Sequence, residues 1–251
     1  MKDRNKLGPL AVLALMRETR KASGDRRPLG VAGARELVPV LARELREGGD
    51  ASAVVEGRVT GVAALVWLGK PDEDLLHDAS HAGVPIVAVS DDDELPYVLA
   101  TDVVHVQPGH GFPLDEIAAA VARRLGDAAV PLAARLPVLR PAVCDRLIES
   151  MARKNALIAA AVFIPGVDMP ILTLNQGRMV LRIALAHGAP VDRPGELLAV
   201  VGAGFGLRAA ARELLDVVPV AGWAVKGSVA YGGTKAIGEA AVRYFASGSV
   251  R

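Results

Sequence analysis

Two groups of side chains in this sequence have the types and spacing that metal chemistry requires. The acidic residues 91–94 directly follow an apolar run, and carboxylates gathered in this way can hold a hard cation. His77 and His81 are four residues apart, so on a helix the two imidazoles would share one face and could share a zinc ion. Each group also has a structural explanation. The acids could cap a following helix, expected at "ELPYVLA", and the histidines, which have no evident third ligand, could lie on a solvated helix face.

A second chemistry is suggested by "VVGAGFG" (200–206) and by Tyr231, which precedes Lys235 by four residues, as in short-chain dehydrogenases. Neither motif has its context. The third glycine of a dinucleotide fingerprint would fall on Leu207, and no acidic residue follows about 20 positions later. Gly202 and Gly206 are better explained by close packing of helices. The sequence also has no G-x-S-x-G motif, Ser-His-Asp order or Cys–His pair, so we lean against an enzyme and expect no cofactor.

Composition describes a folded globular chain. It has 251 residues, of which 51% are hydrophobic and 23% charged, enough apolar material for one large or two modest cores. Residues 1–127 hold 15 Lys and Arg against 20 Asp and Glu, whereas residues 128–251 hold 14 against 8. The two parts therefore differ in sign of charge. The single cysteine, Cys144, has apolar neighbours and is expected to be buried in a reducing compartment.

The first part alternates between short apolar runs and helical patterns. Strands are expected at residues 28–33, 52–57, 62–69, 84–90 and 102–107, and helices at 34–48, 72–83 and 113–126. Acidic residues at the helix starts and glycines at the ends, Gly83 and Gly126, agree with these boundaries. This order predicts an α/β domain with a parallel sheet covered on both faces.

The second part is predicted to be helical after a Pro-rich linker at residues 128–140. A helix covering Cys144 to Phe163 should stop at Pro165 and Gly166, and Asp168 should cap the next helix, in whose first turn Pro170 is tolerated. This next helix should direct its apolar side chains inward and stack two basic residues four positions apart on another face. The inward residues are Ile171, Leu174, Met179 and Ile183, and the basic pair is Arg178 and Arg182.

No apolar run reaches the length of about 20 residues that a membrane span needs. The start, "MKDRNKLGPLAVLALMRETRK", has no cleavage site and is expected to form an amphipathic helix. We therefore expect a cytoplasmic protein. The apolar turn at 162–169 is either buried by neighbouring segments or in contact with a membrane or partner.

Residues 141–246 resemble the YcjF-type helical domain of unknown function that accompanies some Era-like GTPases. The resemblance rests on "FIPGVDMP", on the step from Gln176 to Met179, and on "GGTKAIGEAAVRYF" near the end. In relatives this domain follows a GTPase domain and is often linked with membranes. The resemblance thus implies a GTPase-like α/β domain at residues 1–127 and a helical domain at 128–251.

The α/β part is also similar to such a GTPase domain, without its nucleotide site. Counting from Gly33, the positions of the second glycine, lysine and Ser/Thr of a phosphate-binding loop hold Val38, Pro39 and Val40. The guanine motif Asn-Lys-x-Asp is replaced by "SDDD" (90–93), in which only the last acid matches, and Glu56-Gly57 is the nearest candidate for the Asp-x-x-Gly motif. GTP hydrolysis is therefore not expected.

These observations predict a non-catalytic, pseudo-GTPase-like scaffold or regulatory protein with a protein partner, acting in the cytoplasm or at the inner face of a membrane. The alternative is a metal-binding or small-ligand-binding α/β protein, an enzyme included, that uses the acidic strand edge. Nucleic-acid binding is not predicted because the chain lacks aromatic platforms and a dense basic stripe. The residues expected to contact a ligand or partner are Asp91, Asp92, Asp93, Arg178 and Arg182.

Overall fold

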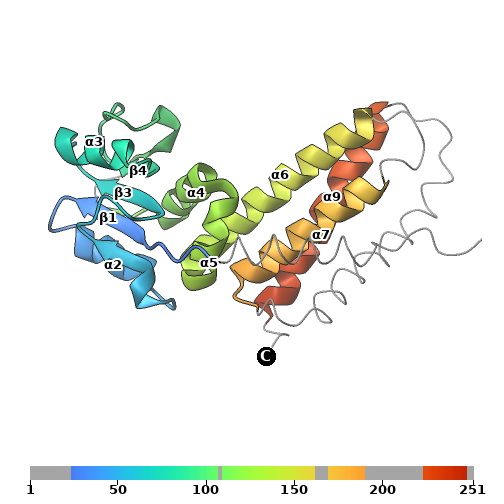
Figure 1. Ribbon diagram of the computed structural model, residues 1–251, viewed down its shortest axis with the longest axis horizontal. Coiled ribbons are helices and arrows are strands. Elements are labelled where there is room, and N and C mark those ends of the chain that lie inside the picture. Colours follow the sequence, from blue (N-terminus) through green and yellow to red (C-terminus); the bar gives the residue numbers. More distant parts are fainter. Residues whose placement is uncertain (1–23, 107–108, 162–168, 190–222, 248–251) are drawn as a thin grey trace, which may run out of the picture. The chain divides into compact units, whose positions relative to one another are not determined.

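The computed structural model describes residues 24–106, 109–161, 169–189 and 223–247. The chain divides into two compact units whose boundary falls within one helix, between Arg146 and Leu147. The first unit contains a five-stranded parallel sheet and the second is helical (Figure 1). The protein is therefore mixed α/β. The unit that contains the sheet includes residues 128–140, which the sequence analysis assigned to a linker at the start of the helical part.

The elements alternate in the first unit, as the apolar runs predict. The strands are β1 (Leu29–Gly33), β2 (Val54–Glu56), β3 (Ala64–Leu68), β4 (Ile86–Val89) and β5 (Val103–Val104). The helices of this unit are α2 (Val38–Leu45), α3 (Glu73–His81), α4 (Leu114–Leu125) and α5 (Val130–Arg135), followed by the start of α6 (Arg140–Ala161). The second unit contains the rest of α6, together with α7 (Met169–Ala186) and α9 (Trp223–Ala246).

All five strands run parallel in the order β2-β1-β3-β4-β5. In β1, which lies between β2 and β3, Val31 pairs with Glu56 on one side and with Val66 on the other. Each predicted strand is present, although each of the five is shorter than the range predicted for it. The predicted parallel sheet is confirmed.

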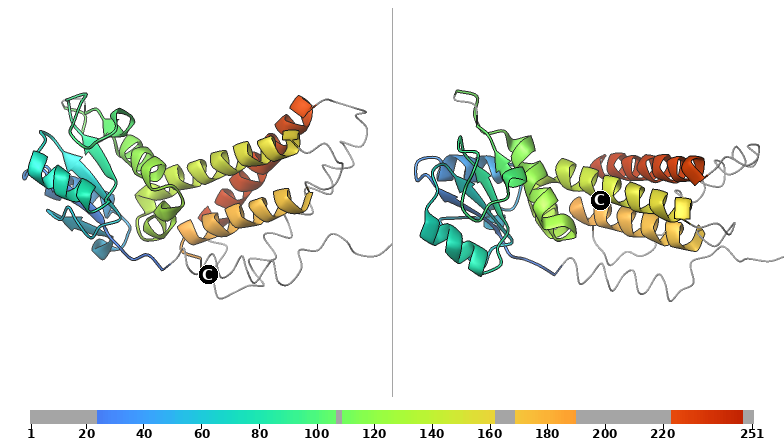
Figure 2. Two further views of the ribbon diagram at one scale, coloured as in Figure 1. Left: turned by 45° about the horizontal axis from the view of Figure 1, so that its top comes forward. Right: turned by 90° about the horizontal axis from the view of Figure 1, so that it is seen from above.

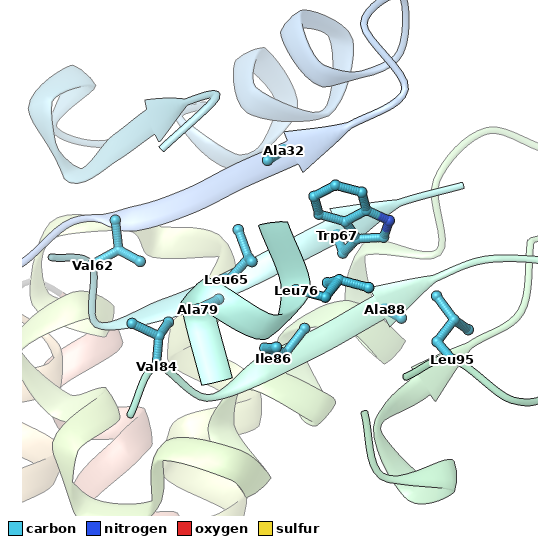
Figure 3. Close-up of a cluster of buried hydrophobic side chains, with 10 residues drawn as sticks. All are labelled: Ala32, Val62, Leu65, Trp67, Leu76, Ala79, Val84, Ile86, Ala88 and Leu95. Atoms are coloured by element: carbon cyan, nitrogen blue, oxygen red, sulfur yellow. The ribbon is translucent and has the colours of Figure 1, made fainter. Parts of the chain in front are cut away.

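Successive side chains of a strand point to opposite faces of the sheet, and helices cover both faces here. Leu65 and Trp67 of β3 belong to a cluster that includes Leu76 and Ala79 of α3 (Figure 3). The intervening Val66 is also fully buried, on the other face. Two helices cover that face: α2 contacts β1 and β2, and α4 contacts β4 and β5. The full cluster comprises Ala32, Val62, Leu65, Trp67, Leu76, Ala79, Val84, Ile86, Ala88 and Leu95.

The ends of α3 show how local sequence fixes a helix. The carboxylate of Asp72 accepts a hydrogen bond from the amide of Leu75 at 3.1 Å, which satisfies one of the free donors of the first turn. Glu73 and Asp74 add negative charge at the same end. Gly83 then takes φ +69° just after the helix, a conformation that glycine adopts without steric cost.

The segment predicted as a linker is ordered by short helices and by one arginine. A 3-10 helix (Gly126–Ala129), α5 and a second 3-10 helix (Pro137–Leu139) follow α4. From the end of α5, Arg135 donates from Nε to Asp50 Oδ2 at 2.9 Å, and through its two other nitrogens to the Ser52 hydroxyl and the carbonyl of Arg26. These bonds fasten residues 126–139 to the sheet unit.

A buried acid ties β5 to α4. Asp102 is 2% exposed and lies in a 3-10 turn (Ala100–Asp102) just before β5. Its two oxygens lie 3.3 Å from Arg123 Nε and 3.4 Å from Arg124 Nε. A buried carboxylate is costly unless it is paired, so the ion pairs with these two consecutive arginines offset part of the cost of burial, although Oδ2 accepts no hydrogen bond.

In the helical unit, α6, α7 and α9 run side by side (Figure 2). Met179 and Ile183 of α7 are fully buried, as their spacing predicts, whereas Ile171 is 48% exposed, so its predicted inward direction is wrong. Ile171 is the third residue of α7, where the helix has only begun. Helix α9 approaches α6 closely at Gly238, since a Cβ placed there would lie 2.5 Å from Cγ1 of Ile148.

Candidate functional site

The carboxyl edge of the sheet is the place where an open parallel sheet binds ligands, at the point where the strand order changes direction. In the order β2-β1-β3-β4-β5 this switch point lies between β1 and β3. Gly33 ends β1 and Leu68 ends β3. Gly33 has φ +114°, and a Cβ on it would lie 2.2 Å from the carbonyl oxygen of Leu68. The two strand ends are therefore pressed together by their backbones.

Three amides in the turn that follows β1 are bonded within the protein. The amide of Ala34 donates to the carbonyl of Leu68 at 2.9 Å, and the amides of Leu37 and Val38 both donate to the carbonyl of Ala34 at 3.0 Å. A phosphate-binding loop instead points several free amides at the anion. Since these three amides already have carbonyl partners, they are not available to a phosphate group.

Side chains in the same turn do not replace those amides. Val38 is buried against the unit, while Val40, one turn into α2, is 37% exposed and apolar. Arg35 is an exposed cation, but Glu36 follows it directly. The start of α2 has no acidic residue in its first turn and no side-chain cap on Leu37. The turn thus closes a helix onto a strand, without the hydroxyl and lysine that hold magnesium and phosphate.

The acidic stretch lies at the end of β4, at the same edge. Ser90 is buried, its amide donates to the carbonyl of Val104 at 3.1 Å, and its hydroxyl accepts from the amide of Asp92 at 3.2 Å. Asp91, Asp92 and Asp93 are exposed. Asp93 Oδ1 lies 3.6 Å from His105 Nε2, which follows β5. Within the described residues, no group of three or more His, Cys, Asp and Glu side chains is arranged to hold a metal ion.

The helix that these acids were expected to cap does not form. Residues 94–99 contain one turn, at Pro96 and Tyr97, and the next regular element is the 3-10 turn Ala100–Asp102. Pro96 disfavours helical geometry at Leu95, and Tyr97 adopts φ +64°, outside the helical region. The capping explanation for residues 91–94 is therefore wrong.

The polar residues inside the apolar stretch of α7 point into the helical unit. Asn175 donates from Nδ2 to Oδ1 of Asn155 on α6 at 2.9 Å. Asn155 and Gln176 donate in turn to the Thr234 hydroxyl of α9 at 3.0 Å and 3.1 Å. All four side chains are buried, with exposures of 8% or less. Each buried amide therefore has a partner, and the layer joins three helices that are distant in sequence.

This layer includes Gln176, one of the residues that carry the family resemblance, and it reveals Asn155, Asn175 and Thr234, which sequence reasoning did not connect. The available signal was an asparagine on the apolar face of α6, at the spacing of core residues. Arg178 and Arg182 of α7 are half-buried, and each interacts with other residues. Helix α7 begins at Met169, so Pro170 lies in its first turn as predicted. The predictions for Pro165, Gly166, Asp168, Gly202 and Gly206 fall outside the described residues.

Tyr231 and Lys235, the pair weighed for dehydrogenase chemistry, lie on α9. The Tyr231 hydroxyl donates to Glu149 Oε2 at 2.7 Å, and Lys235 Nζ lies 5.9 Å from the centre of the tyrosine ring. The bond to Glu149 raises the pKa of Tyr231, while the same bond and one from Arg153 lower the pKa of Glu149. A tyrosine that must lose a proton for catalysis needs the opposite shift. The arrangement is that of a surface hydrogen-bond cluster.

The fold and the closed turn define an α/β protein whose sheet does not present a phosphate loop. Comparison of the chain with protein-family models, with characterised proteins and with solved structures finds no match. The GTPase-associated resemblance described above therefore stays a prediction. In the described part of the chain, no helix has the length and apolar character needed to cross a membrane.

Proposed function

We propose that this chain is a non-catalytic, GTPase-like scaffold or regulatory protein that acts by binding a protein partner. One observation carries the proposal. The turn after β1, where a GTPase would hold phosphate, has the amides of Ala34, Leu37 and Val38 bonded to its own backbone. A parallel sheet whose phosphate position is closed in this way supports a role in binding through surfaces, not nucleotide turnover.

The first test is nucleotide binding by the full chain. We expect titration calorimetry with GTP and Mg²⁺ to show no binding in the micromolar range, and a turnover assay to show no phosphate release above buffer. The same titration with GDP controls for a product-like state. Micromolar affinity for either nucleotide would overturn the proposal, because the turn would then have to open around a phosphate.

The second test concerns the partner. The full chain should be purified from its source under native conditions, crosslinked lightly and examined by mass spectrometry. The proposal expects a protein that is recovered at a fixed ratio and that still binds when both proteins are purified separately. If the chain elutes alone and carries a small molecule instead, the scaffold role is wrong.

The alternative function, a ligand site at the acidic edge, is favoured by one arrangement. Asp93 and His105 come from the ends of neighbouring strands and lie 3.6 Å apart at the edge where such sheets bind ligands. Its test is the melting temperature with Mg²⁺ or Ca²⁺. A rise in the wild-type protein that is lost in the triple variant Asp91→Asn, Asp92→Asn, Asp93→Asn would favour this alternative. The same small rise in both proteins would count against it.

A further inference from the structure

The exposed face of α3 carries two histidines whose rings lie against each other. His77 and His81 are separated by one helical turn, their ring centroids are 6.0 Å apart, and their planes differ by 26°. Both side chains are exposed, so both can change rotamer without disturbing the core. Side chains four residues apart on a helix are neighbours, and rotation about their bonds can turn both nitrogens toward one point in solvent.

The charges around this pair favour a cation. His77 Nδ1 lies 3.9 Å from Oδ1 of Asp78 on the same helix. His81 is the last residue of α3, at the end where the helix dipole is negative. A dication held between the two rings would therefore be attracted both by the carboxylate and by the helix end.

A strained residue from another segment lies against the pair. Tyr97 is the only described residue other than glycine with a positive φ, at +64°, which is costly for a bulky side chain. Its ring contacts the ring of His77 edge-on, with centroids 5.5 Å apart. Strained backbone is retained where the surroundings require it, and functional sites are a common place for it. Tyr97 thus contacts the His77 ring in addition to the contact that His81 makes with it.

We propose that His77 and His81 form a two-histidine site for a divalent transition metal, with Cu²⁺ preferred over Zn²⁺ and water completing the coordination. Imidazole suits copper, nickel and zinc, whereas magnesium and calcium prefer oxygen ligands. The expected order of affinity follows the general rise toward copper and the fall to zinc. The site is separate from the sheet edge and does not depend on the function proposed above.

The geometry makes two specific demands on the binding. Both histidines must contribute, since the second imidazole binds as an intramolecular ligand once the first holds the metal, and loss of either should weaken affinity by about tenfold or more. The metal should also stabilise the fold, because the two imidazoles meet only when α3 is helical. Neither demand applies to metal bound by isolated surface histidines.

The test is a titration of the full chain with CuSO₄ and with ZnCl₂ at neutral pH, followed by calorimetry and by the melting temperature. We compare the wild-type protein with His77→Ala, His81→Ala and the double variant. Alanine is the better helix former, so these changes at exposed positions leave the metal-free fold intact, which circular dichroism checks. The matched control is His110→Ala, which removes another exposed histidine of the same unit.

The expected result is one site per chain that raises the melting temperature, is weakened about tenfold or more in each single variant and is unchanged in the control. The double variant should bind the metal no more tightly than either single one. The proposal is overturned if either single variant keeps wild-type affinity, if His110→Ala abolishes binding, or if the wild-type protein binds neither metal more tightly than the double variant does.

Discussion

Asp50 shows how one exposed side chain can hold several segments. Its carboxylate accepts hydrogen bonds from the hydroxyl and the amide of Ser52, at 2.7 Å and 2.8 Å, and from Arg135 at 2.9 Å. These bonds lower the pKa of Asp50 from 3.8 to about 2, and the bond from the Ser52 hydroxyl is the largest cause. The charged form of Asp50 is therefore the one that the fold prefers.

A prediction about pH follows from the sign of this shift. A carboxylate whose pKa is lower in the folded state than in the unfolded state stabilises the fold fully above the unfolded value. That stabilisation is lost as the pH falls through the folded value. The melting temperature of Asp50→Asn should thus be lower than that of the wild-type protein above pH 3.8, and the two should converge toward about pH 2.

The control for this prediction is Arg135→Gln, which removes one of the partners of Asp50. The melting temperature of this variant should therefore depend less on pH between 3.8 and about 2 than that of the wild-type protein. The measurement is thermal unfolding of the three proteins over a series of acidic buffers. A gap between the wild-type protein and Asp50→Asn that is the same at every pH would show that these bonds do not make stability depend on pH.

At the scale of elements, α9 offers two glycines in opposite surroundings. A Cβ at Gly232 would meet no atom within 4 Å, whereas one at Gly238 would lie 2.5 Å from Ile148 Cγ1. Gly232→Ala should raise the free energy of unfolding by about 1 kcal/mol, the difference in helix propensity. Gly238→Ala should lower it by about 1–3 kcal/mol, because the added methyl group overpacks the contact between helices.

Urea unfolding of both variants measures this contrast. A double-mutant cycle with Ile148→Ala is the control, because the cost of Gly238→Ala should shrink once the Ile148 side chain is removed. If both glycine variants were stabilised equally, α9 would not approach α6 as closely as the structure shows.

Local patterns predicted the elements best where the core also required them. The runs that contain Val31, Val66 and Val87 were recognised as strands because a parallel sheet buries both faces and so needs continuous apolar residues. The segment at 94–99 was misjudged because its apolar content fits a helix, while Pro96 and the conformation of Tyr97 turn the chain. Residues 128–140 were taken for a linker because the partner of Arg135, Asp50, is distant in sequence.

The candidate sites were less predictable, since they depend on contacts between elements. The closed turn after β1 requires the carbonyl of Leu68 on another strand, and no local pattern shows that bond. The buried layer likewise joins Asn155 to Thr234, whose side chains meet only after the helices pack. Motif comparison could show that the phosphate-binding residues are missing, but it could not show that the amides in their place are occupied.

At the scale of the whole molecule, the distribution of charge raises the question of membrane contact. Residues 128–251 hold 14 Lys and Arg against 8 Asp and Glu, and basic surfaces of this kind can bind anionic lipid. Exposed apolar side chains, such as Leu157 at 72% exposure, also favour membrane contact. Against this, Arg178 and Arg182 are half-buried and already interact with other residues.

We therefore expect the purified protein to stay in the supernatant when it is sedimented with vesicles of phosphatidylserine and phosphatidylcholine. The physical reason is that the arginines of α7 are engaged within the protein, which leaves less charge to attract the lipid than the sequence total indicates. The measurement compares low and high salt, because attraction between exposed charges and lipid is screened as salt rises. Phe163→Asp tests the apolar turn predicted from the sequence, and Leu157→Asp tests the exposed face of α6. Pelleting that is salt-sensitive and abolished by Phe163→Asp would reverse the expectation and make membrane recruitment the leading function of the helical unit.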